Sequence, residues 1–151
     1  MRRKLALVAI PLAVMASVGV PSVASAAHTY LSSTVLTGER EVPGPGDDDG
    51  IGRAFANPRP EQGAVCISIR YRNIDPPTGA HIHEGSPDVA GPVVIDFTDL
   101  IATNPPGQIK GCVAVDPELA QDVADNPGDY YVNVHNVDFP AGAIRGQLGG
   151  Q

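Results

Sequence analysis

The feature that most constrains this fold lies near the end of the chain, where two runs of alternating apolar and polar residues flank a short loop. Residues 130–135 are Tyr-Tyr-Val-Asn-Val-His, and residues 143–148 are Ala-Ile-Arg-Gly-Gln-Leu. The segment between them contains Pro140 and Gly142, which favour a turn. Two alternating runs joined by such a loop predict a β-hairpin.

The hairpin should have two unlike faces, because successive side chains of a strand point to opposite sides of a sheet. One face is apolar and is predicted to meet the core through Tyr130, Val132, Val134, Ile144 and Leu148. The other face should point outward and carries Tyr131, Asn133, His135, Ala143, Arg145 and Gln147. We expect the guanidinium group of Arg145 on this face to pair across strands. The face can stay in water, because antiparallel sheets often have one solvated side.

The rest of the chain indicates further short strands, at residues 29–36, 52–56, 64–71, 80–84, 93–97 and 108–115. Pattern alone does not decide which face of residues 64–71 meets the core. One helix is predicted from Pro117 to Asp125, with Asp116 as its cap and Asn126-Pro127-Gly128 as its stop. About eight antiparallel strands and one short helix predict an all-β fold, either a Greek-key β-sandwich or a flattened barrel.

Residues 1–26 are typical of a signal peptide, so the folded domain is predicted to span residues 27–151. Basic residues precede an apolar run from Leu5 to Val20, and Ala24-Ser25-Ala26 fits a small-x-small cleavage site. Cleavage is predicted after Ala26, with Ala27 as the alternative. The paired arginines leave twin-arginine export open beside the general secretory route. The mature protein is therefore expected to be secreted.

Charge narrows the class of partner. Removing the three basic residues of the leader changes the formal net charge from -7 to -10. An acidic domain without a basic cluster in its sequence argues against nucleic acid and anionic membranes as partners. No later apolar run is long enough to span a bilayer. We expect an extracellular protein or surface ligand as the partner.

Cys66 and Cys112 are the only cysteines, and each lies in a predicted strand. An even number of cysteines in an exported chain favours one disulfide bond. The alternative is two buried free thiols.

A metal site is the sharpest chemical hypothesis that the sequence allows. His81 and His83 share one face of a predicted strand, and His135 could supply a third imidazole if the two strands are neighbours. Three imidazoles and an open position suit Zn²⁺ or Cu²⁺. Other groups could orient the ligands by hydrogen bonds, and the candidates are Asn133, Glu84 and Arg145. The alternatives are histidines that only anchor loops, or a contact surface that responds to pH.

Three sequence blocks resemble the CHRD domain family, named for its repeats in chordin and also found singly in secreted bacterial proteins. They are Leu36 to Pro43, Ala80 to Gly85 with Gly91 to Val94, and Tyr131 to His135 with Pro140 to Leu148. At position 143 the chain has alanine where the family usually has glutamate. The resemblance implies an extracellular β-sandwich. A looser similarity to Cu/Zn superoxide dismutase rests on the His-x-His strand alone.

Two functions follow as hypotheses. The first is a secreted, non-catalytic CHRD-type module that binds a protein or cell-surface ligand, because the chain lacks the common enzyme motifs. The alternative is a copper- or zinc-binding protein, with or without redox activity, that uses His81, His83 and His135. A structural component of an extracellular matrix is a third interpretation.

Overall fold

Residues 31–149 are described by the computed structural model, and their strands form one continuous antiparallel sheet. The strand order in the sheet is β5-β4-β7-β8-β1-β2-β3-β6. The strands are β1 (Ser32–Thr37), β2 (Ile51–Arg59), β3 (Ala64–Arg72), β4 (Gly79–Glu84), β5 (Val93–Asp96), β6 (Gln108–Ala114), β7 (Tyr130–His135) and β8 (Ile144–Gln147). The predicted signal peptide and its cleavage site lie outside the described residues.

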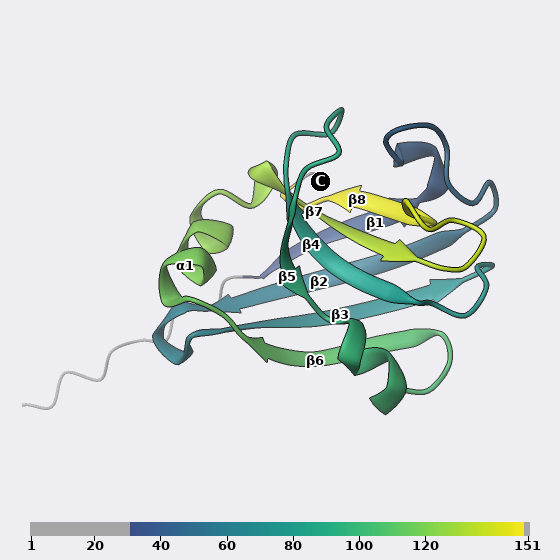
Figure 1. Cartoon of the computed structure of the whole chain (residues 1–151). Helices are drawn as coiled ribbons and strands as arrows, with labels where there is room; N and C mark the ends of the chain where they lie inside the picture. The colour runs from purple at the N-terminus through teal and green to yellow at the C-terminus, as the bar shows by residue number, and fades with distance from the viewer. Residues whose placement is uncertain (1–30, 150–151) are drawn as a thin grey trace, which may run out of the picture.

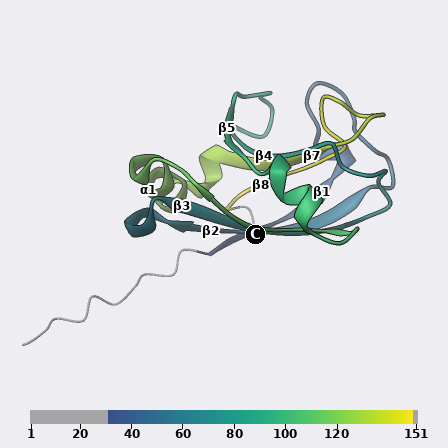
Figure 2. The same cartoon turned by 60° about the horizontal axis from the view of Figure 1, so that its bottom comes forward.

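The sheet curls into a flattened, nearly closed barrel. Strands β4, β7 and β8 form one layer and β2 and β3 the other (Figures 1 and 2). The short 3-10 helix η3 (Thr98–Thr103) contacts both β4 and β6, so it lies across the opening between the two sheet edges. The prediction of eight antiparallel strands with one helix is confirmed. Of its two alternatives the barrel fits better, because one sheet curls on itself instead of two separate sheets packing together.

The core fills the space between the layers. Val65, Ile67 and Ile69 of β3 are almost fully buried, which settles the face that the sequence pattern left open. Helix α1 (Pro117–Asp125) buries Ala120 and Val123 and contacts β2 and β3. Three further 3-10 turns occur at Gly38–Arg40 (η1), Pro60–Gln62 (η2) and Pro127–Asp129 (η4).

Strand β2 is longer than the sequence predicts, because it continues through Pro58 to Arg59. Its pairing with β1 ends at Ala56, whereas its pairing with β3 continues to Arg59. Beyond Ala56 the strand is therefore a local sheet edge, where proline is tolerated because one side needs no backbone donor. The sequence pattern treats proline as the end of a strand, so it does not predict the residues of β2 after Ala56.

The disulfide bond between Cys66 and Cys112 is present, as predicted, and joins directly opposed residues of β3 and the edge strand β6. Both cysteines alternate with inward residues, so the bond lies on the outer surface. Within residues 31–149, no helix combines the length and hydrophobicity needed to cross a bilayer.

Basic residues that are dispersed in the sequence gather on one surface of the folded domain. Five exposed cationic side chains lie on the outer face of the layer that contains β2 and β3; they are Arg53, Arg59, Arg70, Arg72 and Lys110. They are separated in the sequence by as many as 57 positions. Only the pairing of β2, β3 and β6 brings them onto one surface.

Candidate metal centre

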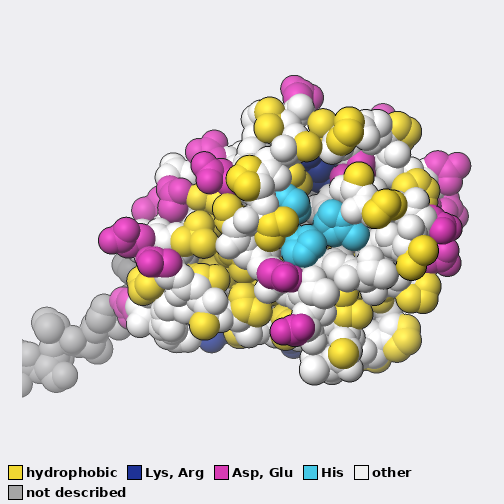
Figure 3. Space-filling view, in the orientation of Figure 1, with side chains coloured by type: hydrophobic (Ala, Val, Ile, Leu, Met, Phe, Trp, Pro, Cys, Tyr) yellow, Lys and Arg dark blue, Asp and Glu magenta, His cyan; other side chains and the backbone are white. Residues whose placement is uncertain are grey.

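The pairing of β4 with β7 brings the three predicted histidines together. Gly79 lies opposite His135, His81 opposite Asn133, and His83 opposite Tyr131. Residues two apart share a face, so His81, His83 and His135 all project from the outer face of these two strands. One nitrogen from each imidazole lies within 4.8 Å of the other two. The histidine side chains meet in one hollow of the surface (Figure 3).

Backbone carbonyl groups fix two of the rings. His83 Nδ1 is 2.9 Å from the Gly91 carbonyl oxygen, and His135 Nδ1 is 3.1 Å from that of Pro140. A carbonyl oxygen can only accept, so each Nδ1 carries the proton and donates it. Each Nε2 then keeps its lone pair when the ring is neutral. His83 Nε2 is buried and has no hydrogen-bond partner among the described residues.

His81, the third histidine, has a partner near each of its two ring nitrogens. Its Nδ1 lies 3.0 Å from His135 Nε2. Its Nε2 lies 3.3 Å from Thr98 Oγ1 and 3.5 Å from a carboxylate oxygen of Asp96. Because His135 Nδ1 donates to Pro140, His135 Nε2 can only accept, so the 3.0 Å contact is a hydrogen bond in which His81 Nδ1 donates. Binding of an ion would move the His81 proton to Nε2, beside Thr98 and Asp96, and free the lone pair of Nδ1. The register between β4 and β5 shifts between Ile82 and His83, and the rings of His81 and His83 are nearly perpendicular, at 77°.

Burial keeps all three imidazoles neutral. It lowers the pKa of His135 to about 4, with the neighbouring ring of His81 acting in the same direction. Burial also lowers the pKa of His81, although Asp96 opposes the effect, and the pKa of His83. Neutral imidazoles are the form that binds transition metals. At neutral pH the cluster therefore carries no positive charge, and it presents three nitrogen lone pairs once the His81 proton moves from Nδ1 to Nε2.

The spacing suits a small transition-metal ion. Two nitrogen ligands of tetrahedral zinc lie roughly 3.3–3.4 Å apart, because Zn–N bonds are about 2.0–2.1 Å long. The closest pair here is 3.0 Å apart and the widest separation is at most 4.8 Å, so small rotations of the rings would meet this geometry. Three imidazoles leave one position open for water or another ligand.

Asn133 and Glu84, which were predicted to orient the histidines, form other contacts in the structure. Asn133 is buried on the same face, but its amide nitrogen donates to both carboxylate oxygens of Glu41, at 2.7 and 2.8 Å. Glu84 is exposed and pairs with Tyr130 on the opposite face of the sheet, so it does not reach the histidines. The groups that do support the rings are Asp96, Thr98 and two backbone carbonyls. Carbonyl groups have no sequence signal, and Asp96 resembles any exposed acid.

Arg145 differs most from the expectation of an outward, exposed guanidinium group, because only 2% of its surface is accessible. Its Nη2 donates to the Ser86 carbonyl oxygen at 2.9 Å. Its Cζ lies 3.4 Å from the ring centroid of Tyr131, and the His83 ring stacks on Tyr131 at 4.7 Å and 8°. Tyr131 lies on the strand between β4 and β8, so its ring is held between the imidazole and the guanidinium.

Loops cover this outer face, and the sequence pattern could not show that. The segment around Glu41 packs over Asn133, and the segment from Gly85 to Pro92 packs over Tyr131 and Arg145. Burial raises the pKa of Glu41 to about 8, although Arg145 and the bond from Asn133 oppose the effect. Gly142 lies so close that a Cβ atom there would be 2.2 Å from Glu41 Oε2.

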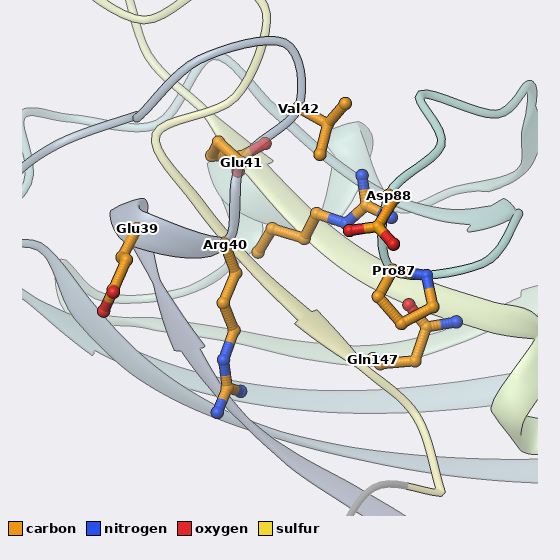
Figure 4. A pocket seen from close by; sticks show the side chains of 8 residues that line it. Glu39, Arg40, Glu41, Val42, Pro87, Asp88 and Gln147 are labelled. Atoms are coloured by element: carbon orange, nitrogen blue, oxygen red, sulfur yellow. The ribbon is translucent and has the colours of Figure 1, made fainter.

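A cavity of about 580 Å³ opens beside these loops. Its lining contains charged and amide groups, namely Glu39, Arg40, Glu41, Asp88, Arg145 and Gln147, with Val42 and Pro87. Glu41 and Val42 reach it from one loop and Pro87 and Asp88 from the other (Figure 4). Tyr131 therefore lies between the histidine cluster and an arginine that lines this cavity.

The model of the CHRD domain family matches residues 32–148. No curated protein and no solved structure matches the chain at a significant level.

Proposed function

The chain belongs to the CHRD domain family, and from this premise we propose that it is a secreted metal-binding domain whose His81, His83 and His135 hold one copper or zinc ion. The observation that carries the proposal is the orientation of the rings. Each imidazole has one nitrogen near a hydrogen-bond partner outside the cluster, and one nitrogen of each ring lies within 4.8 Å of a nitrogen of the other two. Metal-binding histidines in proteins have this arrangement.

The unpartnered nitrogen of His83 supports an ion over a purely structural role. A buried polar atom without a partner costs about 1–3 kcal/mol. A histidine that only anchored a loop would already be satisfied by its bond to the Gly91 carbonyl. Its second nitrogen, Nε2, could then have been exposed to water, but it is buried and has no partner among the described residues. An ion bound by the cluster would satisfy that nitrogen.

Metal titration of the full mature chain tests the proposal. After treatment with a chelator, we expect one equivalent of Cu²⁺ or Zn²⁺ to bind per chain in calorimetry. His83→Ala and His135→Ala should each weaken binding by at least about 100-fold, since each removes one of three ligands. Glu61→Gln is the matched control, because it changes an exposed acid that belongs neither to the histidine cluster nor to the Asp47–Asp49 group.

Two results would overturn the metal site. One is binding that is unchanged in both histidine variants, which would locate the ion elsewhere. The other is no thermal stabilisation by either metal at 100 times the concentration of protein. A saturating ligand should stabilise the fold by about 2.7 kcal/mol when present at 100 times its Kd. Cooperative melting of each variant without metal shows that its fold is intact.

A second function, non-catalytic binding of a cell-surface ligand, is supported by a separate observation. The outer face of β2, β3 and β6 carries five exposed cations, and no aspartate or glutamate occurs in these strands. Such a face has the charge to meet an anionic surface.

A further inference from the structure

The separation of charge on this protein is the feature that no motif accounts for. Residues 31–149 contain 17 acidic and seven basic side chains. The four strands β1, β2, β3 and β6 contain no aspartate or glutamate, yet five of the seven cations project from their outer face. Few Lys or Arg side chains are visible from the histidine side of the molecule (Figure 3). On this acidic protein, the charged side chains of these four strands are therefore all cationic.

The arginines on this face lie against one another and not against acids. Arg53 and Arg70 are directly opposed on β2 and β3, and Arg72 follows two residues later. Like charges at opposed positions destabilise a sheet, since their Cβ atoms are only about 5 Å apart. In the described part of the chain, none of the five cations forms a salt bridge within 4.0 Å. This arrangement becomes favourable when an anion lies between the arginines.

A groove runs through the same group of arginines. It has a volume of about 300 Å³ and is lined by Val35, Ile51, Gly52, Arg53, Arg70, Tyr71 and Arg72. Next to it, Phe55 is 37% exposed and the guanidinium group of Arg53 lies 5.2 Å from its ring centroid. The groove thus combines apolar side chains with guanidinium groups, which bind carboxylates in a bidentate geometry.

We propose that this arginine groove, lined by Arg53, Arg70 and Arg72, binds a carboxylate-bearing polysaccharide. A uronic acid unit has the matching chemistry, because one face of its ring presents C–H groups and its edge carries a carboxylate. The apolar lining takes the C–H face, and the guanidinium groups take the carboxylate. The proposal names a ligand class for the surface-binding function and is independent of the ion site.

The spacing of the cations favours this polymer over nucleic acid. Arg70 and Arg72 are two residues apart on one strand, or about 6.6 Å, and Arg53 is about 5 Å from Arg70. Duplex DNA carries one charge per about 1.7 Å, which is much denser than this set of cations. A polyuronate carries one negative charge per sugar. Fewer of its charges therefore lie near the acidic residues on the rest of the protein, which would repel them.

The same face is poorly suited to a bilayer. Only Val35 and Phe55 expose sizeable apolar surface on it, and they are 41% and 37% exposed. Membrane binding in an interface depends on a larger apolar area together with the charge. The face offers charge and a groove, but little that could insert between lipids.

The experiment titrates oligogalacturonate into the metal-free mature chain at several salt concentrations. We expect saturable binding whose log K falls with log salt, with a slope on the order of -2 for three contacted anions. Arg53→Gln/Arg70→Gln should weaken binding at least about tenfold. Arg59→Gln removes a cation from the same strand about 20 Å from Arg53. This control should change binding by less than about twofold.

Three results would overturn the proposal. The first is absence of oligogalacturonate binding at 50 mM salt. The second is an equal loss in Arg59→Gln, which would mean that the face acts only through its overall charge. The third is tighter binding to single-stranded DNA or to phosphatidylglycerol vesicles at 150 mM salt. Repeating the titration with His83→Ala keeps the outcome separate from the metal proposal, because that variant lacks one ligand of the ion.

Discussion

Glu41 offers the most quantitative test of how the loops cover the outer face. Its carboxyl group is buried, and burial raises its pKa from 4.5 to about 8. Between these two pH values the folded protein keeps a proton on Glu41 that the unfolded chain has released. The folded state binds more protons in this window, so stability must fall as the pH rises.

The three histidines of the cluster act in the opposite direction, and only at lower pH. Burial lowers the pKa of His81, His83 and His135 from 6.5. Below pH 6.5 the unfolded chain therefore binds protons that the folded protein does not, and stability rises with pH. At pH 6.5 the unfolded imidazoles are still half protonated, so the contribution of the histidines is complete only about one pH unit higher. From there to pH 8, Glu41 should dominate, and its own contribution falls by at most about 1.4 kcal/mol for each pH unit.

The perturbation is Glu41→Gln, which keeps the shape of the protonated acid and cannot lose a proton. Urea denaturation of metal-free protein at pH 6.5 and pH 8 measures the free energy of unfolding. We expect the stability of the variant relative to the natural protein to increase by about 2 kcal/mol between these pH values. Glu39→Gln, an exposed neighbour, should show no such change. Parallel pH curves for Glu41→Gln and the natural protein would refute the reasoning, because they would mean that Arg145 keeps Glu41 ionised.

Three further changes test other parts of the structure. Gly142→Ala should destabilise the fold by about 2 kcal/mol or more in thermal melts, because φ is 149° there and the new Cβ would collide with the carboxylate of Glu41. Gly128→Ala is the control: its Cβ would have nothing within 4 Å, so the free energy of unfolding should change by less than about 0.5 kcal/mol. Replacing Cys66 and Cys112 by alanine should lower the free energy of unfolding by about 4 kcal/mol for a separation of 46 residues, and a loss below about 1 kcal/mol would contradict the chain-entropy argument. Asp96→Asn should weaken metal binding about tenfold in calorimetry, and unchanged affinity would show that the carboxylate does not orient its imidazole partner.

Features with local causes could be predicted from the sequence. The helix from Pro117 to Asp125 has the predicted bounds, because its cap, first-turn proline and stop signal are adjacent residues. Asp116 accepts a hydrogen bond from the Glu118 backbone at 2.8 Å, as a capping residue does. The disulfide bond was also predictable, since the two cysteines of the sequence have only each other as partners within the chain.

Features that depend on the partner of a strand could not be predicted. The length of β2 past Pro58 depends on where β1 ends, and the cationic face depends on which strands are neighbours. The convergence of the histidines depended in the same way on β4 pairing with β7. The burial of Arg145 was missed for another reason, because alternation assigns a side chain to a face but does not show whether loops cover that face.

The curling of one sheet into two layers determines how this molecule would sit on a solid support. The histidine cluster lies on the outside of one layer, and the arginine groove lies on the outside of the other. A molecule held on a fibre through its arginines therefore keeps its imidazoles on the far side, facing the surrounding fluid. Immobilisation and ion uptake would then not compete for the same surface, and a coated fibre should take up one ion for each molecule that it carries.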